Sequence, residues 1–156
     1  MALLEKSIQV KRSNLPGAGL GLFARTFIPR NTLIVEYKGR ITTWKEAPLD
    51  DGNNEYIYYV KRNHVIDASR RRSALARYAN DACGLKRVKG LTNNAEYVEI
   101  GLKVFVKSTK DIPAGSEILV DYGKTYWEVI RHNLRVDKQR EKLRLKKTRS
   151  LKRASL

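Results

Sequence analysis

The chain is organised around residues 115–127, which read Gly115-Ser116-Glu117-Ile118-Leu119-Val120-Asp121-Tyr122-Gly123-Lys124-Thr125-Tyr126-Trp127. A turn at Pro113 to Gly115 leads into an apolar segment, Ile118 to Val120, which predicts a strand. Gly123 allows the backbone to bend sharply, so that Tyr122 at the strand end can be directed into a pocket. The alternative is that Tyr122 covers the core and keeps its hydroxyl in water.

Size and composition indicate a single domain. The chain has 156 residues, of which 42% are hydrophobic, enough for one domain with a core. No apolar run approaches the roughly 18 residues that span a bilayer, and residues 1–7 show no secretion signal. Cys83 is the only cysteine, which excludes an intrachain disulfide and a zinc cluster built from cysteines of one chain. We therefore expect an intracellular protein without a membrane segment or a bound metal.

The positive charge is concentrated at the C-terminal end. The formal net charge is +16, and residues 131–156 hold eleven Lys and Arg against Asp137 and Glu141. A segment of this kind should bind polyanions such as nucleic acid in a salt-sensitive manner. The alternative is a solvated tail without a fixed partner.

The hydrophobic pattern predicts many short strands and little helix, which is typical of a mostly-β domain. A short helix is expected over Arg70–Asn80, and a second after Trp127, because Trp127, Ile130 and Leu134 share one helical face. The packed domain should end near residue 136, so that 1–136 form the domain and 137–156 a basic tail, helical or disordered. Besides Ile118–Val120, the predicted strands are Ser7–Lys11, Thr32–Tyr37 with a possible continuation at Ile41–Thr42, a hairpin of Tyr56–Val60 with His64–Ala68, Ala95–Ile100, and Leu102–Lys107. Pro48–Asn54 is a predicted loop.

The glycine-rich segment Gly17-Ala18-Gly19-Leu20-Gly21 can bring its backbone close to a ligand or can form a plain loop. It does not fit a dinucleotide-binding loop, because no helix pattern follows it.

Taken in order, four motifs resemble those of a SET domain, the fold of a large class of protein lysine methyltransferases, over about residues 8–127. They are Gly19-Leu20-Gly21, similar to the family's G-x-G; Glu36-Tyr37-Lys38-Gly39, similar to Y-x-G; Arg77-Tyr78-Ala79-Asn80-Asp81-Ala82-Cys83, similar to R-F-x-N-H-x-C; and Glu117 to Gly123, similar to E-x-L-x-x-D-Y.

The resemblance implies a β-clip-like fold of several small sheets, with a knot-like crossing of the Asn80 and Asp121-Tyr122 segments and a C-terminal helix. It also implies that S-adenosylmethionine and a substrate lysine bind on opposite faces, joined by a narrow channel. Three departures stand out. Asp81 replaces the usual His, a basic insertion displaces the family's second Asn to Asn94, and the zinc-binding cysteine trio is missing. Tyr126, Trp127 and the following helix are the available substitute for that metal site.

Methyl transfer from a sulfonium to lysine needs a neutral amine, although the ordinary pKa of lysine is about 10.4. An apolar channel and the neighbouring sulfonium both lower that pKa, and tyrosine hydroxyls can orient the nitrogen lone pair. The resemblance implies Tyr122 as the catalytic hydroxyl with Tyr37 beside it. Cofactor contacts are implied for Gly19, Leu20, Gly21, Arg77, Asn80, Asp81, Tyr122 and Trp127, and channel positions for Tyr37, Tyr58, Tyr59, Val120 and Tyr126.

The resulting hypothesis is an S-adenosylmethionine-dependent protein lysine N-methyltransferase that acts on a histone or another basic, DNA-associated protein. Val120, two residues before Tyr122, leaves room for di- or trimethylation. The basic segment Arg131–Arg153 is a candidate for nucleic-acid contact, and a homodimer is left open. The place of action would be the nucleus for a eukaryotic, viral or host-delivered protein, and otherwise the cytoplasm. A non-catalytic SET scaffold that binds chromatin or nucleic acid is the alternative.

Overall fold

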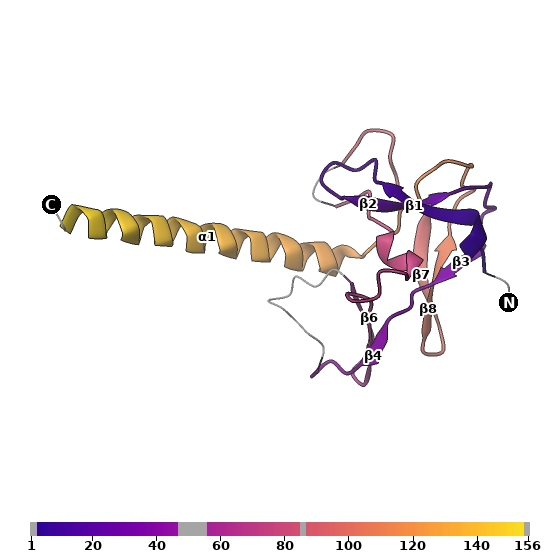
Figure 1. The fold of residues 1–156 in the computed structure, drawn as a ribbon, viewed down its shortest axis with the longest axis horizontal. Coiled ribbons are helices and arrows are strands. Elements are labelled where there is room, and N and C mark those ends of the chain that lie inside the picture. The colour runs from indigo at the N-terminus through magenta and orange to yellow at the C-terminus, as the bar shows by residue number, and fades with distance from the viewer. Residues whose placement is uncertain (1–2, 47–55, 85–86, 155–156) are drawn as a thin grey trace.

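Small antiparallel sheets form the body of the molecule, and one long helix follows them (Figure 1). The structure is a computed structural model and describes residues 3–46, 56–84 and 87–154. The predicted loop Pro48–Asn54 lies outside the described residues. Among the described residues, no helix combines the length and the apolar character that crossing a bilayer requires.

Within the described residues, the strands pair in three sheets, each antiparallel. In the first sheet, β1 (Ile8–Arg12) pairs with β2 (Leu20–Ala24) in a register that places Ile8 opposite Ala24. The second has the order β3 (Leu33–Glu36), β8 (Lys103–Ser108), β7 (Ala95–Ile100). The third has the order β4 (Arg40–Thr42), β6 (His64–Asp67), β5 (Ile57–Lys61). Two short 3-10 helices, η1 (Glu5–Ser7) and η2 (Leu75–Tyr78), complete the body.

The core lies between these sheets. β8 shows how the pattern produces it, because Val104, Val106 and Ser108 alternate with more exposed residues and are fully buried. The β7–β8 turn contains Gly101 at a φ of +63°, a left-handed conformation that glycine adopts without strain. Other fully buried members of the main cluster are Leu22, Ile28, Ile34, Ile112, Ile118 and Val120. The predicted mostly-β fold of several small sheets is therefore confirmed.

The predicted strand Ile118–Val120 is extended and buried but does not join a sheet. It forms isolated bridges instead: Leu119 pairs with Asn80 in parallel, and Val120 pairs with Ala95 in parallel. Its amides follow the same pattern, since Ile118 donates to the Leu22 carbonyl at 2.7 Å and Val120 to the Asn80 carbonyl at 2.8 Å. The segment lies between several elements, and its three side chains are therefore all buried. The knot-like crossing of the Asn80 and Asp121-Tyr122 segments stays a prediction.

Two further sequence predictions need correction. The short helix expected over Arg70–Asn80 is reduced to η2, because Ala79 turns to an extended conformation and places its carbonyl in the site. The glycine-rich segment is a loop only as far as Gly19, since β2 begins at Leu20 and pairs along its length with β1.

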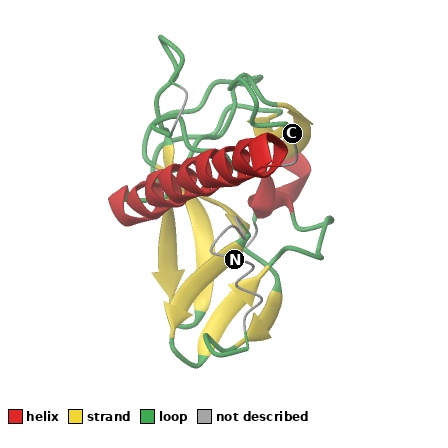
Figure 2. Ribbon diagram, turned by 90° about the vertical axis from the view of Figure 1, so that its left-hand side faces the viewer, coloured by secondary structure: helices red, strands yellow, loops and turns green. Residues whose placement is uncertain are grey.

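The C-terminal helix α1 (Lys124–Ala154) begins as predicted but runs 31 residues without a break. Trp127 and Ile130 are half-buried, whereas Leu134 is already 44% exposed. Every residue from 137 to 154 is exposed. Figure 1 shows the helix extending away from the sheets, and in Figure 2, which looks from the side of the helix, it lies in front of them.

Candidate active site

Two adjoining clefts lie where the glycine-rich loop, the Asn80 segment, the Tyr122 segment and the start of α1 meet. They share Ala18, Asn80 and Tyr122. The first, of about 270 Å³, is also lined by Leu15, Pro16, Gly17, Asp81, Gly84, Tyr126, Trp127 and Ile130. The second, of about 360 Å³, is also lined by Gly19, Leu20, Tyr56, Arg72, Arg77 and Tyr78.

Tyr122 lies at the junction of the two clefts. Its hydroxyl donates to the Ala79 carbonyl at 2.5 Å, so the hydroxyl is directed into the protein. Its ring meets that of Tyr126 edge to face, with centroids 5.0 Å apart, and stacks with the Trp127 ring at 5.9 Å. The side chain is therefore held both by its ring and by its hydroxyl.

Asp81 holds the site together. This carboxylate is only 5% exposed and accepts four hydrogen bonds. Oδ1 accepts from the Cys83 amide and from Asn93 Nδ2, both at 2.8 Å. Oδ2 accepts from the Tyr122 amide at 2.9 Å and from Trp127 Nε1 at 2.7 Å. The four donors satisfy the acceptor sites of the carboxylate and connect α1 to the Tyr122 backbone.

A second buried carboxylate, Glu117, holds the glycine-rich loop. It is 3% exposed and accepts from Ser13 Oγ at 2.6 Å and from the Asn14 amide at 2.9 Å. Asn80 Nδ2 bridges from this carboxylate, at 3.4 Å, to the Leu20 carbonyl at 2.9 Å. Gly21 is required here, because a Cβ at that position would overlap the Glu117 side chain.

Asn94, expected from sequence to replace a displaced asparagine of the family, brackets the segment before Tyr122. Its side chain donates to the Glu117 carbonyl and accepts from the Leu119 amide, both at 2.9 Å. Asn93 accepts from the Ala82 amide at 2.8 Å in addition to its bond with Asp81. The two asparagines thus fix both segments that border the clefts.

A continuous row of aromatic rings leads from the clefts into the second and third sheets. Tyr97 stacks with Tyr122 at 6.4 Å and meets Tyr58 at 5.4 Å and Tyr37 at 5.9 Å. Burial raises the pKa of Tyr97 and of Tyr37 well above the usual value. Burial and then the neighbouring Glu99 carboxylate raise the pKa of Tyr58 to about 12. Tyr37, Tyr58 and Tyr97 are therefore neutral at physiological pH and offer phenol hydroxyls in an apolar setting.

Tyr97 was missed by the sequence reasoning. Ala95 in β7 is buried, and Tyr97 is two residues farther along the strand on the same face. This period-two spacing, directly after Asn94, was the available signal.

The structure separates the two channel candidates on β5. Tyr58 belongs to the aromatic row, and its hydroxyl donates to Glu99 Oε1 at 3.1 Å. Tyr59 is 50% exposed and packs edge to face on Trp44, at 5.3 Å, away from the row. Consecutive strand residues point to opposite faces of a sheet, which explains the difference.

The remaining predicted site residues have mixed surroundings. Val120 is fully buried in the main core. Arg77 lines the second cleft, but its guanidinium donates to the Ala68 and Ser69 carbonyls and stacks on the Tyr56 ring at 4.0 Å, which gives it a structural part. Trp127 packs against Gly84, where a Cβ would lie 2.5 Å from the indole ring.

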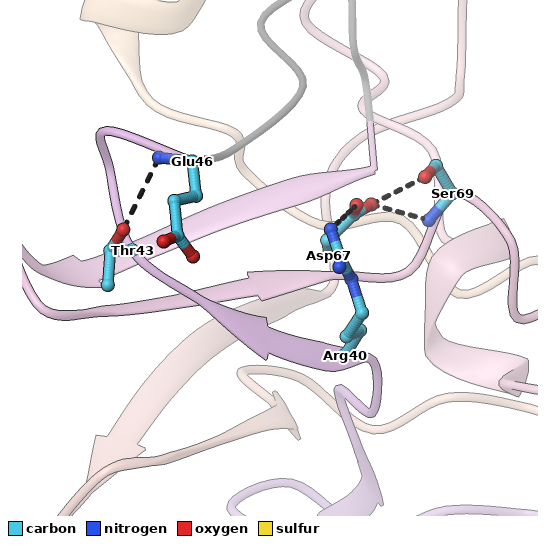
Figure 3. Close-up of polar contacts among 5 residues, drawn as sticks. All are labelled: Arg40, Thr43, Glu46, Asp67 and Ser69. Carbon is cyan, nitrogen blue, oxygen red and sulfur yellow. Dashed lines mark hydrogen bonds and ion pairs between the residues drawn. The ribbon is translucent and has the colours of Figure 1, made fainter.

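A third cavity, of about 460 Å³, lies outside this site. As Figure 3 shows, Arg40 and Asp67 face each other, with 4.0 Å between Arg40 Nη2 and Asp67 Oδ2. Asp67 also accepts from the Ser69 amide and hydroxyl, and the Glu46 amide donates to Thr43 Oγ1 at 3.3 Å. Arg70 and Arg71 complete the lining. Its charges of both signs give it no clear ligand preference.

The described residues contain no group of three or more His, Cys, Asp or Glu side chains suited to a metal ion. The clefts present tyrosine hydroxyls and aromatic faces, together with the guanidinium groups of Arg72 and Arg77 and the amide of Asn80.

Comparison with known proteins relates this arrangement to one family. The family model for the SET domain matches residues 19–123. Histone-lysine N-methyltransferase set-17 of Caenorhabditis elegans is 34% identical over 119 residues, which cover 76% of this chain and 41% of that protein. Histone-lysine N-methyltransferase 2D of Homo sapiens is 29% identical over 126 residues, which cover 76% of this chain and 2% of that protein. The chain thus spans less than half the length of either relative.

Among solved structures, the methyltransferase domain of human PR domain-containing protein 2 superimposes with a TM-score of 0.56 at 24% sequence identity. The match covers 77% of this chain and 79% of that domain. This likeness supports the fold described above.

Proposed function

Because this chain belongs to the SET-domain family, we propose that it is an S-adenosylmethionine-dependent protein lysine N-methyltransferase. The observation that carries the proposal is the position of Tyr122. It lies where the two clefts adjoin, and the row of tyrosines begins at its ring. A cofactor in the clefts and a lysine along the row would therefore meet at this side chain.

The clefts suit the parts of this cofactor. The Trp127 ring and the apolar loop from Leu15 to Ala18 line one end, where an adenine can stack. Arg72 and Arg77 line the other end, where positive charge favours a carboxylate. Between them, Gly19, Leu20 and Asn80 offer polar backbone and side-chain groups. When bound, the cofactor supplies a methyl group activated by its sulfonium.

Asp81 serves as a positioning residue in this proposal. All its acceptor sites are used by donors of the chain itself, so it acts on the cofactor through Trp127 and the Tyr122 backbone. This replaces the direct contact that the resemblance implied.

The tyrosine row supplies the conditions for amine attack. Tyr37, Tyr58, Tyr97, Tyr122 and Tyr126 would enclose the lysine, whose ammonium form is disfavoured by loss of water. The hydroxyl of Tyr122, fixed by Ala79, would orient the amine for in-line attack on the methyl carbon. The nitrogen–carbon bond forms as the carbon–sulfur bond breaks. We propose that Val120 leaves room for more than one methyl group.

The substrate we propose is a histone or another basic, DNA-associated protein, since histone-lysine methylation is what the names of the relatives describe. The functional domain would comprise residues 1–136, and the place of action would be intracellular, in the nucleus for a eukaryotic or host-delivered protein.

The test is methyl transfer from labelled S-adenosylmethionine to histones, nucleosomes and cell lysate, followed by mass-spectrometric mapping of the methylated lysine. Tyr122→Phe should lower kcat by about 100-fold or more, while calorimetry finds cofactor affinity within a few-fold of wild type. Tyr58→Phe should raise KM for the substrate, whereas Tyr59→Phe, outside the row, should change neither constant. Full activity of Tyr122→Phe would disprove its assigned role, and a wild-type protein with no heat of cofactor binding would indicate a non-catalytic scaffold.

A further inference from the structure

Basic side chains form a continuous stripe along the exposed part of α1. Its members follow one another at intervals of three or four residues and are all exposed: Arg131, Arg135, Lys138, Lys142, Lys146, Arg149 and Arg153. At about 100° of rotation per residue, they fall within a band about 80° wide on the helix surface. The basic segment is therefore an ordered face with one charge on every turn.

Within residues 131–154, the other charged side chains lie outside the band of this basic stripe. Asp137 and Glu141 fall outside the band, and Glu141 pairs with Arg144, also outside it, at 2.6 Å. The second ion pair of α1, Lys124–Glu128, precedes the stripe. Neither of these ion pairs within the described helix includes a stripe residue.

The stripe has no explanation in the packing of the domain. Residues 137–154 are exposed, and the helix extends away from the sheets (Figure 1). Like charges three or four residues apart destabilise a helix, and this segment lacks the tertiary packing that supplies most of the stability of helices in proteins. A polyanion laid along the stripe would remove both disadvantages.

The dimensions and composition favour a duplex. From Arg131 to Arg153 the helix rises about 33 Å, close to the roughly 34 Å of one turn of B-DNA, whose major groove admits an α-helix. Single-strand binders use aromatic side chains as stacking platforms, and α1 contains no Phe, Tyr or Trp after Trp127.

A second copy of the helix is a poorer occupant than DNA. The exposed leucines Leu143, Leu145 and Leu151 point to different sides of the helix and make no seam for a coiled coil.

We infer that the basic stripe of α1 binds double-stranded DNA through the phosphate backbone, without reading the base sequence. This binding needs neither the cofactor nor methyl transfer, so it can be tested separately from the proposed enzyme activity.

The experiment is fluorescence anisotropy of a labelled duplex of about 20 base pairs with the full chain, at salt concentrations from about 50 to 200 mM. A stripe variant carries Lys138→Gln, Lys142→Gln, Lys146→Gln and Arg149→Gln. A matched control carries Arg140→Gln, Arg144→Gln, Lys147→Gln and Lys152→Gln. Both remove four charges from the same segment and keep side chains that favour a helix, and circular dichroism checks that helix content is retained.

We expect the stripe variant to weaken the Kd at least about 30-fold more than the control, and to reduce the slope of log K against log salt by about 3.6. Duplexes of different sequence should bind equally, and DNA should raise the helix content of the wild type. Equal weakening by the two variants would overturn the inference, because net charge alone would then account for binding. Preferred binding to single strands, no binding at the lowest salt, or self-association in place of binding would also overturn it.

Discussion

Replacing Asp81 by Asn, which exchanges one carboxylate oxygen for an amide nitrogen, should strongly destabilise this protein. An asparagine has one acceptor oxygen, whereas the carboxylate accepts at both oxygens from four donors. In either orientation of the amide, its NH2 group faces two donors. Two buried hydrogen-bond donors therefore lose their partner.

The magnitude follows from that count. Each buried donor without a partner costs about 1–3 kcal/mol, so Asp81→Asn should lower the free energy of unfolding by about 2–6 kcal/mol. A domain of this size is stable by about 5–15 kcal/mol, so the variant should still fold at low temperature. At about 2–4 °C per kcal/mol, Tm should fall by roughly 5–20 °C.

The assay is urea unfolding of wild type, Asp81→Asn, Trp127→Phe and the double variant. Trp127→Phe removes the indole N–H and its bond to Oδ2, together with ring atoms that pack on Gly84. The comparison with the double variant separates the hydrogen bond from this loss of packing. In the double variant the amide introduced at position 81 can turn its NH2 group to the position of Oδ2, where only the Tyr122 amide is left as an unpartnered donor. The two effects should therefore be less than additive, with a coupling energy of at least about 1 kcal/mol.

Additive losses would refute this reasoning, because Asp81 and the indole N–H would then not interact. A loss below about 1 kcal/mol for Asp81→Asn would refute it as well, since the carboxylate would not be buried among four donors. Because Asp81 positions Trp127 and the Tyr122 backbone beside the first cleft, both single variants should also weaken cofactor binding.

Three further predictions concern other parts of the fold. Gly39→Ala should destabilise the protein by about 1–3 kcal/mol or more, because a Cβ would lie 2.5 Å from the Asp67 carbonyl oxygen and 2.8 Å from the Ala68 amide nitrogen. Gly101 lies at an open left-handed turn, so Gly101→Asn should change the free energy of unfolding by less than about 1 kcal/mol. Glu117→Gln should leave Ser13 Oγ or the Asn14 amide without an acceptor. Limited proteolysis should then cut the glycine-rich loop faster than in wild type, and an equal rate would contradict the role of Glu117 in holding this loop. The pKa values of Tyr37, Tyr58 and Tyr97 are raised on folding. The stability that these shifts contribute is therefore complete below about pH 10, the pKa of an unfolded tyrosine, and is lost as the pH rises towards 12. Urea unfolding midpoints measured from pH 8 upwards should fall, and a constant midpoint contradicts the prediction.

Much of the fold was predictable because it depends on local patterns. Short apolar, β-branched and aromatic runs bounded by turn residues located most of the strands, and the shared face of Trp127 and Ile130 located the start of α1. The four motifs in order identified the family, and helical spacing of basic residues is enough to define the stripe once the helix is known to continue. Local patterns fail where a segment is apolar on every side, as Ile118–Val120 is, because burial alone does not say which element supplies its hydrogen bonds.

The candidate site illustrates the same division. From the sequence alone, Asp81 was a departure from the family's usual His for which the resemblance implied a direct cofactor contact, and Tyr58 and Tyr59 were equal candidates for the channel. The donors that meet Asp81 lie up to 46 positions away along the chain, and the ring partners of Tyr58 are Tyr37, directly after β3, and Tyr97 in β7. A sequence determines which residue types are available and which face of an element they occupy. Which faces meet depends on the packing of distant elements, and only the tertiary structure shows that Asp81 holds Tyr122 and Trp127 together at the junction of the clefts.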